Sequence, residues 1–235
     1  MYKVALSYLI HLFTISGVVL SFLALIFAID QNIPAVFFFL ALALFVDGID
    51  GTLARSANVQ QHTPNINGEI LDNIIDFLNY TFIPAFVIYW CGFVPKGMEL
   101  LSASVVLVVS CYTFANNKVK TKDFYFSGFP ALWNVVILYF YILNTSQLTN
   151  FYFILFFSVL TFIPFKYLHP FRVVQLRKTS LIILLLWMLA TIVLLYFPES
   201  SSATIILSYV LWAISNTYFL ALTVIRTTKD RLFKS

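Results

Sequence analysis

Four aspartates stand in two neighbouring apolar stretches of the chain, where a charged side chain is costly in lipid. Asp47 and Asp50 lie in the first stretch, and Asp72 and Asp76 lie in the second. Because charged residues within membrane spans are rare unless they have a function, these aspartates indicate a functional site. Carboxylate oxygens suit hard ions such as Mg²⁺, Mn²⁺ or Ca²⁺ rather than zinc. Because Mg²⁺ commonly bridges carboxylates to substrate phosphates, this set predicts a divalent-metal site that serves a phosphorylated substrate.

Helical spacing places these carboxylates on one face of each helix, because a helix turns by about 100° per residue. The first face carries Asp47, Asp50, Gly51 and Ala54. The second face carries Gly68, Asp72 and Asp76 at positions i, i+4 and i+8. The connection between the helices is short enough for them to run antiparallel, so the two faces can meet. The small residues leave room for a flat group such as a nucleotide base.

Aspartates within membrane spans also occur in proteins that are not enzymes. They could form a structural cation site, or line the ion path of a divalent-cation transporter. Neither alternative calls for small residues and Arg55 at fixed distances from the carboxylates, so these neighbours favour an enzyme.

The composition indicates which kind of protein must position these residues. Of the 235 residues, 61% are hydrophobic and 10% are charged. Soluble domains are nearer half apolar and a quarter charged. This excess of apolar side chains could not be hidden in one soluble core. We therefore expect one membrane-embedded catalytic domain over residues 1–235. Cys91 and Cys111 form no ligand pair and no disulfide framework.

Apolar stretches predict the membrane spans, because a helix needs about 20 such residues to cross the hydrocarbon layer. Eight stretches qualify or nearly qualify: 5–29, 33–54, 69–91, 99–116, 129–144, 150–166, 180–197 and 203–224. The fifth and sixth are short and aromatic-rich, which leaves seven spans or a re-entrant helix open. No barrel-type alternation is present. The predicted fold is an all-α integral membrane protein with about eight transmembrane helices.

Basic residues predict the orientation in the membrane. With eight spans, thirteen of the fourteen Lys and Arg residues fall in one set of loops, and only Lys96 falls in the other. By the positive-inside rule, both termini and the 55–68 loop are cytoplasmic. The basic face could also attract anionic lipid head groups, or could serve topology alone. We expect membrane lipids, and no nucleic acid, among the partners.

The charged and small residues together form one longer pattern. It reads Asp47-x-x-Asp50-Gly51-x-x-Ala54-Arg55, twelve residues, then Gly68-x-x-x-Asp72-x-x-x-Asp76. This pattern resembles the signature of the CDP-alcohol phosphotransferase family, and every fixed position matches. The resemblance implies a six-helix core, here followed by two C-terminal helices. It also implies transfer of a substituted phosphoryl group with release of CMP, in a protein that is usually a homodimer.

The resemblance assigns roles to matching positions. The implied ligands of Mn²⁺ or Mg²⁺ are Asp47, Asp50, Asp72 and Asp76. The implied catalytic residues are Asp72 and Asp76, with Asp76 as the general base that takes the acceptor's hydroxyl proton. The implied contacts to CDP are Asp47, Gly51, Thr52, Ala54, Arg55 and Gly68.

Outside the signature, the chain resembles one branch of the family, the bacterial phosphatidylcholine synthases. The similarity lies in LDNIIDFLNYTFIPA at 71–85, in FYFSGFPALWN at 124–134 and in the two C-terminal helices. It implies CDP-diacylglycerol as donor, choline as acceptor and a bacterial inner membrane. A phosphatidylserine synthase of the same fold is the alternative. No Lys or Arg lies within the apolar body of a predicted helix, which favours an acceptor without an anionic group.

Choline carries a quaternary ammonium, which proteins hold with aromatic faces and acidic groups. The candidate choline-binding residues are Trp133, Tyr125, Tyr80 and Glu69. Membrane aromatics also pack or anchor at the interface, and Glu69 could simply stabilise a helix N-terminus.

Several polar residues stand within the apolar stretches: His11, Asn73, Asn79 and Asn134. We expect them to bond to a neighbouring helix, with substrate binding as the alternative for the three asparagines.

Overall fold

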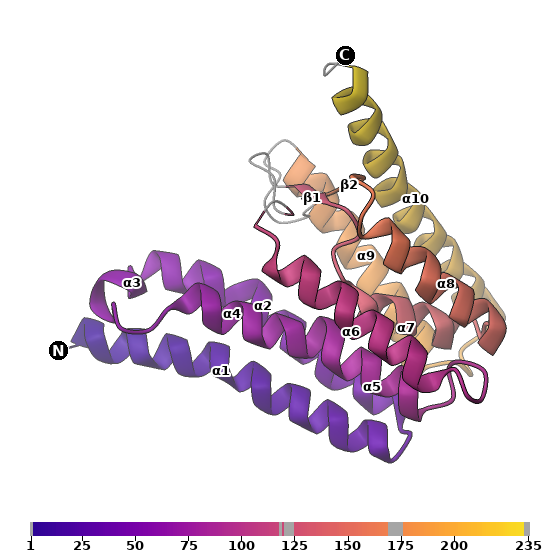
Figure 1. Ribbon diagram of the computed structural model, residues 1–235, viewed down its shortest axis with the longest axis horizontal. Coiled ribbons are helices and arrows are strands. Elements are labelled where there is room, and N and C mark those ends of the chain that lie inside the picture. The colour runs from indigo at the N-terminus through magenta and orange to yellow at the C-terminus, as the bar shows by residue number, and fades with distance from the viewer. Residues whose placement is uncertain (1, 118, 120–124, 169–175, 233–235) are drawn as a thin grey trace. The chain divides into compact units, whose positions relative to one another are not determined.

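The computed structural model describes residues 2–117, 119, 125–168 and 176–232, which are almost entirely helical (Figure 1). It divides into two compact units. Unit 1 holds residues 1–114 and 131–154, and unit 2 holds residues 115–130 and 155–235. The expected single catalytic domain over 1–235 stays a prediction.

Unit 1 contains the two carboxylate-bearing helices. Its elements are α1 (Tyr2–Ile29), α2 (Ile33–Ser56), α3 (Val59–His62), α4 (Gly68–Phe77), η1 (Leu78–Phe82), α5 (Ile83–Trp90), α6 (Glu99–Ala115, to residue 114), α7 (Trp133–Ile142) and the first part of α8 (Gln147–Leu160). The segments α4, η1 and α5 form one continuous helix with a π-helical turn at η1.

Unit 2 contains the two C-terminal helices and a small sheet. Its elements are β1 (Tyr125–Ser127), the end of α8, β2 (Lys166–Leu168), α9 (Arg177–Tyr196) and α10 (Ser202–Leu232). The strands are antiparallel, with Tyr125 opposite Leu168. Helices α9 and α10 pack together, and β2 packs on α10, where the Lys166 amide donates to the Thr227 hydroxyl at 2.8 Å. This two-stranded sheet was not among the elements predicted from the sequence.

The eight predicted apolar stretches all correspond to helices, and the all-α membrane fold is confirmed. Among the described residues, five helices are long and apolar enough to cross a membrane. The remaining three, α6, α7 and α8, have 17, 10 and 14 residues. The predicted stretch 129–144 begins as a helix only at Trp133, after Pro130. The stretch 150–166 stops being helical at Leu160.

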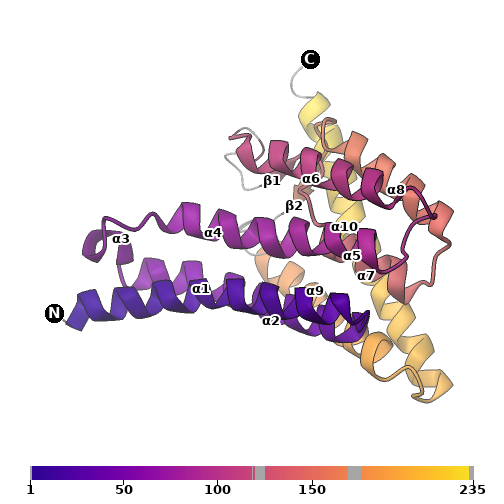
Figure 2. The same cartoon turned by 60° about the horizontal axis from the view of Figure 1, so that its bottom comes forward.

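Helix α1 supports the carboxylate-bearing helices, because it packs against α2, α4 and α5 (Figures 1 and 2). Its buried positions include the small residues Gly17, Ser21, Ala24 and Ala28. A Cβ on Gly17 would lie 2.7 Å from Ile75 Cγ2, so only glycine allows the present approach of α4. Small residues permit such close packing of membrane helices.

The connection from α2 to α4 reverses the chain direction, so the two helices run antiparallel as predicted (Figure 1). It contains the single turn α3 and ends at Asn67, whose side chain accepts hydrogen bonds from the amides of Glu69 and Ile70. This cap satisfies donors that the first turn of a helix leaves unpaired. Gly68 therefore begins α4, and the register of the carboxylate stripe is fixed from its start.

Candidate metal-binding active site

Three carboxylates from two helices meet at one point. Asp47 and Asp50 on α2 and Asp72 on α4 each offer an oxygen, and these oxygens all lie within 4.8 Å of one another. Asp50 is only 5% exposed, and the other two side chains are half-buried. The two faces that helical spacing predicted therefore do meet, at distances that one divalent cation could bridge.

The donor set fits a hard divalent cation. Three oxygen ligands in a partly buried position repel one another unless a cation balances their charge. Mg²⁺ and Mn²⁺ take carboxylate ligands and complete their coordination with water or phosphate oxygens. The chemistry of the three side chains is thus consistent with the predicted metal site.

Asp76 extends the cluster by one turn of α4. It is half-buried and lies close enough to Asp47 for the two side chains to interact. It is also within electrostatic range of the Tyr80 hydroxyl, four residues further along the helix. All four predicted aspartates are thus brought together, and a fourth carboxylate lies beside the three that could hold a metal ion.

Two further residues reach the cluster. The Tyr80 hydroxyl, in η1, donates to Asp47 Oδ2 at 2.9 Å. The hydroxyl of Thr14, on α1, lies close enough to Asp50 to interact with it. Sequence reasoning assigned Tyr80 to choline and did not single out Thr14. A lone threonine in an apolar helix carries no signal until the packing of α1 against α2 is known.

The residues expected at CDP lie along the end of α2 and the start of α4. Arg55 folds back over Gly51, since a Cβ on that glycine would lie 3.2 Å from Arg55 Nη1. The other terminal nitrogen, Nη2, donates to Thr52 Oγ1 at 3.3 Å. Ala54 is half-buried and Gly68 is exposed. This edge therefore combines a positive charge with small side chains, as binding of a phosphate beside a nucleotide base would require.

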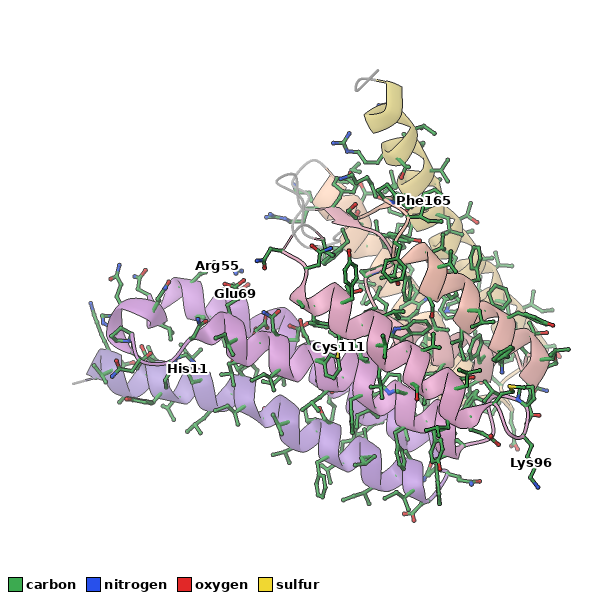
Figure 3. All side chains as sticks on the ribbon, in the orientation of Figure 1. His11, Arg55, Glu69, Lys96, Cys111 and Phe165 are labelled. Atoms are coloured by element: carbon green, nitrogen blue, oxygen red, sulfur yellow. The ribbon has the colours of Figure 1, made fainter. Side chains whose placement is uncertain are left out.

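The site lies toward one end of unit 1. Figure 3 shows Arg55, Glu69 and His11 at that end, and Lys96 at the opposite end. Glu69 is exposed in the first turn of α4.

The four candidate choline-binding residues occupy different surroundings. Tyr80 bonds to a carboxylate of the cluster, as described above. Trp133 is fully buried, and its Nε1 donates to Ser110 Oγ at 2.9 Å. Tyr125 belongs to unit 2, where the guanidinium of Arg226 lies over its ring, with Cζ 5.4 Å from the centroid. Phe124, which opens the 124–134 string, lies outside the described residues. The choline roles of these residues stay predictions.

Two of the polar residues in apolar stretches bond between elements, as expected. Ser21 on α1 donates to Asn79 Oδ1 at 2.8 Å. His11 Nε2 lies 3.0 Å from Thr63 Oγ1 in the connection between α2 and α4. Asn134 Oδ1 accepts locally from the Val135 amide.

The comparisons with known proteins agree with the site geometry. The model of the CDP-alcohol phosphatidyltransferase family matches residues 5–216. The chain is 43% identical over 183 residues to a phosphatidylcholine synthase of Mesorhizobium japonicum, covering 78% of this chain and 68% of that protein. It is 39% identical over 221 residues to a phosphatidylcholine synthase of Pseudomonas aeruginosa, covering 94% of this chain and 92% of that protein. A phosphatidylcholine synthase of Borreliella burgdorferi is 33% identical over 222 residues, covering 87% of this chain and 95% of that protein.

Proposed function

The chain belongs to the CDP-alcohol phosphatidyltransferase family, and we propose that it transfers a phosphatidyl group from CDP-diacylglycerol to choline, giving phosphatidylcholine and CMP. The observation that carries this proposal is the meeting of Asp47, Asp50 and Asp72 within 4.8 Å, contributed by both halves of the family signature. The choice of choline rests on relatives that are named phosphatidylcholine synthase and resemble the chain over most of its length.

Phosphoryl transfer depends on positioning and on neutralising charge. In this proposal Asp47, Asp50 and Asp72 hold Mn²⁺ or Mg²⁺, with Asp76 as a further neighbour. When bound, the ion would polarise the diphosphate and stabilise CMP as it leaves. Because the carboxylates lie within the membrane-spanning helices, they set how deep in the membrane the diphosphate binds. The acyl chains of the donor can remain in the surrounding lipid.

The exposed end of α2 suits the nucleotide part of the donor. Gly51, Ala54 and Gly68 place no bulky side chain beside it. Arg55, which is held toward Thr52, supplies positive charge for a phosphate oxygen. These residues orient CDP so that the phosphorus bearing diacylglycerol faces the acceptor.

Asp76 is the proposed general base. It takes the hydroxyl proton of choline as the choline oxygen attacks the phosphorus that carries diacylglycerol. A phosphorus–oxygen bond forms to choline, and the phosphorus–oxygen bond to CMP breaks. Glu69, near the same end of unit 1 as Arg55, would add negative charge for the ammonium (Figure 3).

Acceptor assays test this proposal. Purified protein in lipid nanodiscs is incubated with CDP-diacylglycerol and Mn²⁺, and separately with choline, serine, inositol or glycerol phosphate. Of the four acceptors, we expect only choline to give a product, with phosphatidylcholine and CMP formed in equal amounts. Product with serine and none with choline would instead identify a phosphatidylserine synthase. Metal flux into liposomes without CMP release would indicate a transporter.

We also propose a bacterial inner-membrane protein with both termini in the cytoplasm, and a homodimer. The asymmetry of basic residues supports the orientation, and the family resemblance supports the dimer. Single cysteines at Lys3 and at Lys96, in a background without Cys91 and Cys111, test the orientation. In intact cells, a membrane-impermeant maleimide should label only the cysteine at position 96. Light scattering of the detergent-purified protein tests the dimer.

A further inference from the structure

Tyr80 continues the carboxylate stripe of the third membrane-spanning helix. Gly68, Asp72 and Asp76 recur every four residues, and Tyr80 is the next position in the series. The Tyr80 hydroxyl donates a hydrogen bond to Asp47 Oδ2 on the opposite helix, α2, at 2.9 Å. We propose that Tyr80 is a positioning residue, which holds Asp47 in the orientation that its metal-ligand role requires.

The Asp47 carboxylate meets both the Tyr80 hydroxyl and the carboxylate cluster. Oδ2 accepts from Tyr80, and an oxygen of the same carboxylate lies within 4.8 Å of oxygens from Asp50 and Asp72. A carboxylate that is free to rotate loses conformational entropy when it binds a metal. A tyrosine donor removes part of that cost beforehand, because it selects one rotamer of Asp47. Partners of this kind commonly orient metal ligands and tune their affinity for the ion.

The local backbone geometry favours this contact. In an unbroken α-helix, positions four apart drift by about 40° around the axis, so a series of three such steps turns well away from its starting face. The helix instead contains the π turn η1, in which the Ile83 amide bonds to the Leu78 carbonyl five residues back. A π turn is wider and rotates less per residue. It therefore counteracts the drift just where Tyr80 must still face Asp47.

The π turn also contains a buried polar group that is unsatisfied among the described residues. The Thr81 hydroxyl is fully buried and has no hydrogen-bond partner among the described residues. An unpaired buried hydroxyl costs free energy, and π turns are frequent at functional sites. The segment η1 also packs against α1, α2 and α7, so the tyrosine is held from several sides.

This role rests on the proposed function, because Asp47 is a metal ligand only if the site binds metal. The positioning role and the choline-cage role use different parts of the Tyr80 side chain. A cage uses the face of the ring, whereas positioning uses the hydroxyl alone. Tyr80→Phe separates the two, since phenylalanine keeps the ring and removes the donor.

The test compares Tyr80→Phe with Tyr89→Phe, the same change at an exposed tyrosine further along the same helix. We expect the Mn²⁺ concentration for half-maximal activity to rise about tenfold or more in Tyr80→Phe. Saturating Mn²⁺ should restore most of kcat, and the KM for choline should not change. Tyr89→Phe should match the wild type in all three quantities.

An unchanged Mn²⁺ dependence in Tyr80→Phe, or a raised choline KM at saturating Mn²⁺, would overturn the proposal. Electron paramagnetic resonance can measure the binding of Mn²⁺ to each variant in the presence of CDP. This measurement needs no acceptor. It therefore distinguishes a wrong role for Tyr80 from a wrong choice of acceptor. Wild-type protein that binds Mn²⁺ but makes no phosphatidylcholine would refute the function, while the comparison of variants would still decide the role of Tyr80.

Discussion

His11 on α1 and Thr63 in the connection between α2 and α4 are joined by a hydrogen bond of 3.0 Å across 52 positions of sequence. Both side chains are buried. The Thr63 hydroxyl donates to the Val59 carbonyl, so it accepts from His11 Nε2. A Cβ on Gly68 would lie 3.9 Å from His11 Cε1. The bond thus attaches the connection between α2 and α4 to α1, and this connection determines where α4 begins.

Replacing Thr63 by Val should destabilise unit 1, because it leaves the buried His11 donor unpaired. We expect a loss of about 1–3 kcal/mol in the free energy of unfolding. Thermal unfolding in nanodiscs measures it. Thr228→Val is the control, since that hydroxyl is exposed and its bonds within the described part of the chain go to the backbone of its own helix. Equal melting temperatures for the two variants would contradict a structural role of the bond.

Gly51→Ala should weaken binding of the donor. Its Cβ would lie 3.2 Å from Arg55 Nη1, so the guanidinium must shift by a few tenths of an ångström from its place beside Thr52. We expect a raised KM for CDP-diacylglycerol in steady-state assays. Gly48→Ala is the matched control, because it makes the same change on the same helix with nothing within 4 Å. Both variants gain similar helix propensity, so an equal KM in the two would refute the placement of Arg55 at the donor.

Gly128→Ala should strongly destabilise unit 2. Gly128 has a φ of +87°, and its Cβ would lie 2.2 Å from the Thr161 carbonyl oxygen. Gly97 has a similar φ of +91° with nothing within 4 Å, so Gly97→Ala carries only the backbone strain, about 1–2 kcal/mol. The yield of folded protein and its melting temperature should fall much further for Gly128→Ala. Similar losses in both variants would show that the contact with Thr161 is unimportant.

Trp133→Ala should raise the KM for choline if the indole forms part of the acceptor site. The residue is fully buried, so the same change also costs about 3–5 kcal/mol of stability. Ser110→Ala serves as the control, because it removes the hydrogen-bond partner of Trp133 and keeps the indole. Assays below the melting temperature of each variant separate binding from stability. A lower melting temperature with an unchanged choline KM would exclude Trp133 from the cage.

The sequence predicted the carboxylate cluster well, because its geometry follows from helical periodicity and from the short connection between the two helices. Asp47 and Asp50 share a face by spacing, and Asp72 and Asp76 share another. A short connection brings the two faces together. The eight apolar stretches were found for a similar reason, since their length and composition need no knowledge of packing.

The contacts of individual side chains could not be predicted in the same way. The bond from Tyr80 to Asp47 is made from within the π turn at η1, and neither propensity nor periodicity indicates such a turn. Thr14 reaches Asp50 only because α1 packs closely on α2. The strands β1 and β2 pair three residues each across a gap of about 40 positions, a length too short to give a recognisable strand pattern.

The central claim is that α2 and α4 supply ligands to one shared cation that binds the nucleotide diphosphate. Mn²⁺ binding in the presence of CDP tests it most directly, in wild type, Asp50→Asn, Asp72→Asn and the double variant, with Asp30→Asn as a control outside the site. We expect each single variant to lose Mn²⁺ binding, the double variant to lose little more, and Asp30→Asn to bind Mn²⁺ as the wild type does. Wild-type affinity in either Asp50→Asn or Asp72→Asn, or independent additive losses from the two helices, would contradict a shared site.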